Sequence, residues 1–568
     1  MPRLLSGLVI CLITLFFCAY NFYFSVNFPF QDDFLIIQFI EAASEAGFAF
    51  GAVVQEMFRT FNDHKAVTIR LLALIEYAIT GHQNFRFYIL LVSVNLTYIF
   101  YFLYLQFKKS GLPLYYFIPA PFLFFTPLYH EVSGWALNGM QHSFLTVFTV
   151  TAILLASRKT TAAFWLAMVC CFLATFTHGN GVLSFPAIVF YFLCFKDFKR
   201  AILTCVAMVA CLAVYLIGYE AGQAVQLPTD LMSMLSSLFG FIGSSMSLFP
   251  SPELWSALWG LFIVGFMLVL LIRVAAIYFN KPATVKPGTI ELLTLFAFIF
   301  VTSAVIALFR SWAGSTIASR FQLYAALSTV MCYILLLGYS SFLRRKQVFA
   351  TVTFLSVLYW GYAYFSLTNM VAAKRTTYLA DVYNWKTNHN LFSVEKTIAR
   401  NADFYLTPGY EKGFFRLPKP VVEKAELDSM FTSNARAAAG DSIYLEDWHV
   451  TRTVQNGVEN LTHTFLASNR MPVEKGILSD RFLVLKDIKT GTVHLLNANP
   501  KTEGRKKFLR TGIYYHEGFK TFLRADDLAF GVYQMAILDV GFRGKKRFYP
   551  LDPALVVNEM GFSLQENQ

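Results

Sequence analysis

The chain has 568 residues and a net charge of +12 at pH 7; 56% of its residues are hydrophobic and only 14% are charged. Soluble domains carry roughly 25% charged residues, so this composition excludes an ordinary soluble protein. The positive charge is spread over many loops instead of forming one patch, which argues against a nucleic-acid partner.

Apolar runs of roughly 20 residues, the length that a membrane helix needs, fill the first two thirds of the chain. We predict a polytopic α-helical membrane domain at residues 1–367 with about eleven spanning helices. Their approximate limits are 4–24, 86–107, 113–128, 141–156, 162–177, 182–195, 201–219, 254–279, 290–309, 321–343 and 348–367. The first run is interpreted as an uncleaved helix because no A-x-A cleavage site follows it.

The charges of the loops predict an orientation. Alternate loops carry Lys and Arg, and the intervening loops carry most of the acids. By the positive-inside rule the basic loops and the N-terminus are cytoplasmic. We therefore expect a multi-pass protein of the cytoplasmic (inner) membrane, with an extracytoplasmic C-terminal domain that is periplasmic in a Gram-negative cell.

Two outer loops are long. The first, residues 25–85, has amphipathic stretches at 34–46 and 67–79 that predict interfacial helices. The second, residues 220–253, is apolar but rich in Ser and Gly, and we interpret it as re-entrant or interfacial. After the last span, residues 368–439 indicate a mixed helical connector. Alternating residues at 440–568 predict a soluble, β-rich, sandwich-like domain.

Two adjacent carboxylates, Asp32 and Asp33, follow directly after the first span. Acids at the membrane edge are costly to hold there unless a function uses them. Neighbouring side chains point in different directions, so we expect one aspartate to face an active cavity and the other to cap the next helix. A partly desolvated carboxylate is a capable general base. Both are candidate catalytic residues, with Asp32 slightly preferred; the alternative is that both only cap.

The other outer loops collect side chains suited to a lipid phosphate and a sugar. The candidate phosphate ligands are Arg320, Arg310, Arg70, Lys65 and His64, with Asp63 and Trp312 in the same loops; the candidate sugar-binding residues are Trp135, Gln141, Asn138 and Asn180. For any single loop, interfacial Trp and snorkelling Arg are the alternative. Four such loops on one side favour a shared site. No cofactor is expected, and a divalent metal between His64 and Asp32 has no supporting spacing.

This layout resembles the GT-C superfamily of membrane glycosyltransferases, which use polyprenyl-phosphate-linked sugars. The matching stretches are QDDF at 31–34, DHKAVTIRLL at 63–72, GMQHSF at 139–144, GNGVLSFP at 179–186 and ASRF at 318–321. They are similar to bacterial members that decorate cell-envelope polysaccharides, including O-antigen-modifying glucosyltransferases. The resemblance covers residues 1–367 and leaves the tail unmatched. Phe321 departs from the Tyr frequent in the family, and the missing second acidic motif implies a metal-independent mechanism.

The residues and the resemblance together predict an inverting glycosyltransferase. It would move a sugar from a polyprenyl-phosphate carrier to a glycan or lipid-linked acceptor, with Asp32 or Asp33 as base and the basic residues stabilising the leaving phosphate. Its partners would be that donor, the acceptor and membrane lipids. A lipid-linked-sugar flippase or polysaccharide polymerase is one alternative. A glycan acyltransferase, which would need His64 or His178, is another. The β-rich domain would hold an acceptor glycan or serve a structural role.

Overall fold

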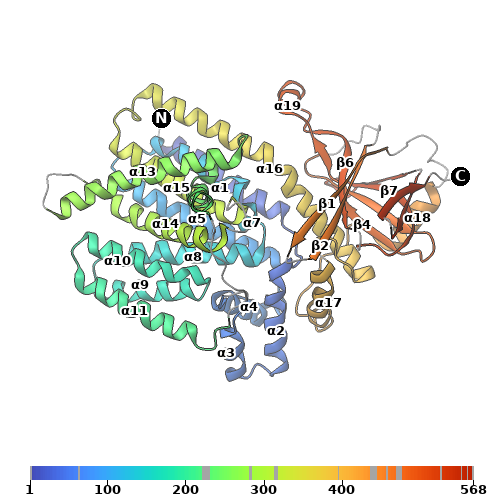
Figure 1. The fold of residues 1–568 in the computed structure, drawn as a ribbon, viewed down its shortest axis with the longest axis horizontal. Coiled ribbons are helices and arrows are strands. Elements are labelled where there is room, and N and C mark those ends of the chain that lie inside the picture. Colours follow the sequence, from blue (N-terminus) through green and yellow to red (C-terminus); the bar gives the residue numbers. More distant parts are fainter. Residues whose placement is uncertain are drawn as a thin grey trace. The chain divides into compact units, whose positions relative to one another are not determined.

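The computed structural model describes residues 3–61, 64–220, 230–279, 285–311, 317–394, 396–434, 444–455, 458–468, 476–524, 527–551, 553–559 and 561–565. The chain divides into two compact units. The helical unit comprises Met1–Ser25 and Leu35–Leu367, and the β unit comprises Val26–Phe34 and Thr368–Gln568. Figure 1 shows that helices make up the first unit and that the strands lie in the second.

Within the described residues, eight helices are long and apolar enough to cross a membrane. They are α1 (Arg3–Phe24), α5 (Phe85–Lys109), α8 (Ala136–Ala156), α11 (Phe198–Leu216), α13 (Pro252–Tyr278), α14 (Thr289–Arg310), α15 (Gln322–Tyr339) together with the short helix η7 (Ser319–Phe321), and α16 (Lys346–Asn388). Three shorter apolar helices are α9 (Thr161–Thr175), α10 (Ser184–Cys194) and α12 (Leu231–Gly243). The chain is therefore a helical membrane protein, as its composition predicts.

One predicted span is not a continuous helix. Residues 113–128 form three short pieces, η2 (Leu114–Phe117), α6 (Pro119–Phe124) and η3 (Pro127–Tyr129). Proline starts a helix readily but cannot continue one, because it lacks the backbone N–H and clashes with the preceding turn. Pro119 and Pro127 each begin one of these pieces. The prediction of a single spanning helix here is wrong, because these prolines divide an otherwise apolar stretch.

The first long loop folds into α2 (Phe34–Glu45), α3 (Phe50–Phe58) and α4 (Val67–Thr80). On α4, Leu71, Ile75 and Ile79 are exposed at intervals of four residues, whereas Arg70 and Ala73 on other faces are buried. The helix expected at 67–79 is thus present and amphipathic; its interfacial position stays a prediction. In the second long loop the described part contains α12; residues 221–229 lie outside the described residues.

Two glycines bring α12 and α13 into backbone contact. An added Cβ at Gly260 would lie 1.9 Å from the carbonyl oxygen of Phe239, and one at Gly243 would lie 2.0 Å from the carbonyl oxygen of Ser256. Both distances are far inside van der Waals contact, and both obstacles are backbone atoms. The Ser- and Gly-rich composition of α12 therefore serves close helix packing.

Gly260→Ala is expected to destabilise the helical unit, because the backbone of α12 would have to move away. Overpacking of this kind costs about 1–3 kcal/mol. Gly265→Ala on the same helix is the matched control, since a Cβ there meets nothing within 4 Å. Thermal unfolding of the two purified variants in detergent measures the difference. Equal midpoints would contradict the close approach of α12 and α13.

The β unit contains two antiparallel sheets (Figure 1). One has the order β10-β9-β7-β3-β4, with β8 paired to β7, and the other has the order β1-β2-β6-β5. The strands are β1 (Tyr444–Gln455), β2 (Val458–Ser468), β3 (Asp480–Asp487), β4 (Val493–Asn497), β5 (Pro500–Thr502), β6 (Tyr515–Arg524), β7 (Gly531–Val540), β8 (Lys546–Pro550), β9 (Ala554–Asn558) and β10 (Gly561–Gln565). Leu483 and Met535 of the first sheet share a buried cluster with Phe519 and Leu523 of the second, so the sheets have a common core.

Helices cover the other face of the six-stranded sheet. Ala380 and Tyr383 of α16 and Leu427 of α18 (Lys424–Asn434) are buried against Phe482 and Leu538 of the sheet. Helix α17 (Lys396–Glu411) lies between α16 and α18 in the chain. The described part of the connector predicted at 368–439 contains these helices, and its first part continues α16 without a break to Asn388; residues 435–439 lie outside the described residues.

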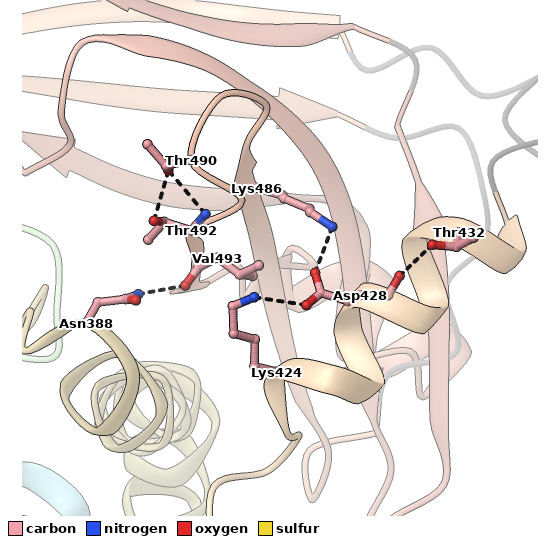
Figure 2. Close-up of polar contacts among 8 residues, drawn as sticks. All are labelled: Asn388, Lys424, Asp428, Thr432, Lys486, Thr490, Thr492 and Val493. Carbon is pink, nitrogen blue, oxygen red and sulfur yellow. Dashed lines mark hydrogen bonds and ion pairs between the residues drawn. The ribbon is translucent and has the colours of Figure 1, made fainter.

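Polar side chains fasten α16 and α18 to this sheet (Figure 2). Asn384 of α16 donates to the carbonyl of Leu495 at 2.7 Å and accepts from its N–H at 2.8 Å. Asn388 donates to the carbonyl of Val493 at 2.8 Å. On α18, Asp428 accepts hydrogen bonds from Lys424 and, at 2.7 Å, from Lys486 of β3. The two asparagines thus occupy the open edge of β4, which would otherwise expose unpaired backbone groups.

Candidate functional site

Three histidines from separate segments meet at one end of the helical unit. His64 precedes α4, His142 lies in the second turn of α8, and His178 caps the short helix η4 (Gly179–Leu183) after α9. The ring centroids of His64 and His178 are 4.0 Å apart, and those of His142 and His178 are 5.4 Å apart. We call these three residues the histidine cluster.

Glycines allow this approach. An added Cβ at Gly181 would lie 2.0 Å from the carbonyl oxygen of Ala174, so η4 folds tightly against the end of α9. A Cβ at Gly179 would lie 3.1 Å from Nδ1 of His64, which leaves just enough room for that ring. The N–H of Asn180 donates to Nδ1 of His178 at 3.3 Å. A neutral His178 therefore carries its proton on Nε2.

His142 connects the cluster to α15. Its Nδ1 lies 3.1 Å from the hydroxyl of Tyr324, which is buried. The ring of Phe321 meets His142 edge-on, with centroids 6.2 Å apart and an interplanar angle of 89°. The start of α15 and the start of α8 therefore lie at the same end of the unit, next to His178.

Two arginines give this end a positive potential. Arg310 is exposed at the last residue of α14, and Arg320 is half-buried in η7, just before α15. Both lie within electrostatic range of His142. Desolvation lowers the pKa of His178 well below its usual value, and the charges of His64, His142 and Arg310 lower this pKa further. A site with arginines beside neutral imidazoles is suited to an anion.

The short helix α7 (His130–Ser133) positions the segment that carries Arg320. The backbone N–H of Arg320 donates to Oε2 of Glu131 at 3.1 Å. The hydroxyl of Ser319 donates to the carbonyl of Leu128 at 2.7 Å and lies 2.9 Å from Nδ1 of His130. These contacts fix the backbone of η7, the segment that carries Arg320.

Two predicted phosphate ligands have other contacts. Lys65 is 2% exposed, and its ammonium group donates to the carbonyl of Ile217 at the end of α11. Arg70 is also 2% exposed, and its guanidinium donates to the carbonyls of Met57 at 3.2 Å and Arg59 at 2.5 Å. Burial lowers the pKa of Arg70 to about 10, so it stays charged at neutral pH. Lys65 therefore joins the first loop to the end of α11, and Arg70 joins α4 to the end of α3.

The predicted sugar-binding residues lie next to the cluster along the chain. Trp135, Asn138 and Gln141 are buried at the start of α8, the helix that carries His142. Asn138 donates to the carbonyl of Glu131 at 2.9 Å, which ties α8 to α7. Asn180 is half-buried two residues after His178.

The two aspartates belong to the β unit, whereas the histidine cluster belongs to the helical unit. The rings of Phe28 and Phe30 pack on Tyr378, with centroids 6.0 and 5.3 Å away. Asp33 is 2% exposed, and its Oδ2 accepts a hydrogen bond from the N–H of Phe30 at 3.0 Å. Asp32 is half-buried. The carboxylate of Asp33 therefore accepts from the N-cap residue of the short helix η1 (Gln31–Asp33), which directly precedes α2.

The backbone beside the aspartates is strained. Gln31 has a φ of +47°, a left-handed conformation that is uncommon for any residue other than glycine. Such strain costs about 1–3 kcal/mol and concentrates at functional sites. The conformation of residues 30–33 is thus held by its surroundings, which include the hydrogen bond between Asp33 and Phe30.

His142 and Tyr324 were not among the predicted site residues, and His178 was named only for the acyltransferase alternative. The available signal was that His142 and His178 both lie at helix ends that the charge pattern assigns to one side. Asp63 and Trp312 lie outside the described residues. In the described part of the chain, no group of three or more His, Cys, Asp or Glu side chains is arranged to hold a metal ion. No family model, curated protein or solved structure matches the chain.

Proposed function

We propose that this chain is an inverting glycosyltransferase that moves a sugar from a polyprenyl-phosphate carrier to a glycan or lipid-linked acceptor at the outer face of the cytoplasmic membrane. The observation that carries the proposal is the convergence of Arg310, Arg320 and the histidine cluster at one end of a bundle of membrane-length helices. A lipid-linked phosphate is an anion that the bilayer itself delivers to such a site.

The cluster would bind the donor phosphate. Cleavage of the bond between the anomeric carbon and the phosphate oxygen leaves negative charge on the polyprenyl phosphate, and Arg310 and Arg320 would stabilise that charge. Nε2–H of His178 would donate a further hydrogen bond, since Nδ1 already accepts from Asn180. Lys65 and Arg70 would support the loop and leave phosphate binding to these residues.

Asp32 would act as the base. Its carboxylate would accept the proton of an acceptor hydroxyl while the hydroxyl oxygen bonds to the anomeric carbon and the phosphate leaves from the opposite face, which inverts the configuration. Asp33 is the weaker candidate because its carboxylate is buried and accepts from Phe30. Trp135, Asn138, Gln141 and Asn180 would hold the sugar, as their residue types suggest.

A glycan acyltransferase is the second candidate. The observation that favours it is the ring contact between His64 and His178, because acyl transfer often uses a histidine as general base. An effective base has a pKa near the working pH. The strongly lowered pKa of His178 makes it a poor proton acceptor and a suitable neutral hydrogen-bond donor. The glycosyltransferase therefore remains the first proposal.

Arg310→Gln and Arg320→Gln are each expected to slow sugar transfer from a labelled polyprenyl-phosphate donor, with a raised KM for the donor. Loss of one charge-assisted hydrogen bond costs about 1.5–3 kcal/mol, which corresponds to roughly 10- to 150-fold. The pKa of His178 lies well below its usual value, so this ring stays neutral between about pH 7 and about pH 5. The wild-type KM for the donor should therefore change little across that range.

Arg273→Gln is the matched control, because Arg273 is an exposed arginine that stacks on Tyr339, with 5.4 Å between the guanidinium and the ring centroid. It should leave the donor KM unchanged. Acyl transfer without sugar transfer by the wild type would replace the proposal with the second candidate. Unchanged transfer in both the Arg310 and the Arg320 variants would show that these arginines do not bind the donor phosphate.

A further inference from the structure

The connection between β5 and β6 carries a concentrated positive charge. It contains the short helix α19 (Arg505–Thr511), which lies away from the two sheets in Figure 1. Residues 500–513 include five basic residues and one acid: Lys501, Arg505, Lys506, Lys507, Arg510 and Glu503. Lys507 pairs with Glu503 at 2.5 Å. Arg505, Lys506 and Arg510 are exposed.

The same segment exposes aliphatic side chains. Leu509 is 83% exposed and Ile513 is 51% exposed. Phe508 packs inward on Tyr514, with ring centroids 6.0 Å apart, so the helix has an anchored side and an outward side. Exposed aliphatic side chains among basic residues are typical of segments that lie in a membrane interface.

Hydrogen bonds join the base of this segment to α16, just beyond the apolar stretch predicted at 348–367. The N–H of Asn369 on α16 donates to the hydroxyl of Tyr514 at 3.1 Å, and its side chain donates to the carbonyl of Pro500 at 3.5 Å. Helix α16 has no charged residue between Lys346 and Lys374, and its apolar stretch ends two residues before Asn369. At a rise of about 1.5 Å per residue, Asn369 lies about 3 Å beyond that stretch.

We propose that residues 501–513 form a docking surface for the anionic phospholipid headgroups of the bilayer that α16 crosses. Arg505, Lys506 and Arg510 bind headgroup phosphates, and Leu509 and Ile513 enter the boundary between headgroups and acyl chains. An acidic glycan would share the charge complementarity. However, sugars are bound by aromatic faces and amides, and the exposed apolar groups here are aliphatic.

Docking of this surface would orient the β unit against the bilayer. The segment Val26–Phe34, which carries Asp32, belongs to the same unit. The lipid composition of the membrane would thus affect the placement of that aspartate. The docking surface itself stands on the contacts and charges of residues 500–514 and does not depend on the proposed transferase activity.

Hydrogen–deuterium exchange of the full-length protein in lipid nanodiscs tests the surface. Amides of residues 505–513 are expected to exchange several-fold more slowly in discs of phosphatidylcholine with phosphatidylglycerol than in discs of phosphatidylcholine alone. High salt should remove the difference, because it screens exposed charges. The double variant Lys506→Gln, Arg510→Gln should also lose it, and Leu509→Ser should reduce it.

The hairpin between β7 and β8 provides the matched control. It also exposes a basic, apolar tip, with Arg543, Lys545 and a Phe542 that is 67% exposed. The double variant Arg543→Gln, Lys545→Gln should leave the slowing at residues 505–513 intact. Equal exchange in the two kinds of disc would overturn the proposal. So would slowing that appears only when an acidic polysaccharide is added to phosphatidylcholine discs.

Discussion

Asp32→Asn is expected to abolish sugar transfer while the protein folds normally. Removal of a general base lowers the rate by about 100- to 10,000-fold. The amide cannot accept the proton of the acceptor hydroxyl, but it has the shape of the carboxylate. Because Asp32 is half-buried, the substitution should leave the folded yield unchanged. Initial rates with a labelled polyprenyl-phosphate-sugar, normalised to monodisperse protein, measure the effect.

Asp33→Asn is the matched control on the adjacent residue. Its Oδ1 can still accept the hydrogen bond that Asp33 receives from the N–H of Phe30, so transfer should stay within a few-fold of wild type. Full loss in Asp33→Asn with activity in Asp32→Asn would reverse the two roles. Activity in both variants would show that the base lies elsewhere, and His64 and His178 would be the next residues to substitute.

The helical framework could be predicted because bilayer thickness fixes the length of an apolar helix. The prediction failed where proline residues or packing on another element also determined where a helix ends. Residues 113–128 have the right composition, but Pro119 and Pro127 divide them into short pieces. The opposite error occurred in α16, which continues past its apolar stretch to Asn388 because Ala380 and Tyr383 pack on a sheet formed about 100 residues later.

The types of side chain at the candidate site could be predicted from the sequence, but not which residues form the site. Charge pattern and helix count predicted polar side chains at one end of the spans. In the structure, Arg310, Arg320 and His64 lie near His142 and His178. A lysine or arginine that already binds a backbone carbonyl is less able to bind a phosphate. Which of them do so cannot be read from the sequence, because the carbonyls come near only in the folded chain. Lys65 meets the carbonyl of Ile217, and Arg70 meets that of Met57, so both support the loop. His142 joins the cluster through Tyr324, which lies 182 residues away in the chain.

The residues that contact the segment carrying Asp32 and Asp33 could not be predicted either. Their position after the first span suggested that they belong with the helices. The segment Val26–Phe34 instead joins the β unit, because Phe28 and Phe30 pack on Tyr378 and Asn27 donates to the carbonyl of Arg416 at 2.7 Å. No local pattern in residues 26–34 indicates partners that lie more than 300 residues later.

Asn384→Leu is expected to destabilise the β unit severely, although leucine has the same branching at Cγ as asparagine. Asn384 and Leu495 are both fully buried, and the amide satisfies both the N–H and the C=O of Leu495 at the open edge of β4. Leucine would leave both backbone groups buried without these partners. Each unsatisfied group costs about 1–3 kcal/mol, so a total loss of about 2–6 kcal/mol is expected.

Asn388→Leu is the control one turn further along α16. Asn388 is half-buried; its Nδ2 donates to the carbonyl of Val493 and lies 3.4 Å from Nδ1 of His494, and water can replace these contacts more readily. Limited proteolysis and hydrogen exchange of the full chain should show faster opening of β3, β4 and β7 in Asn384→Leu, with the spans of the helical unit unchanged. If both variants opened equally, the docking of α16 would depend on its apolar contacts with the sheet. A larger effect at Asn384 would show that a single amide closes the edge of this sheet as a neighbouring strand would.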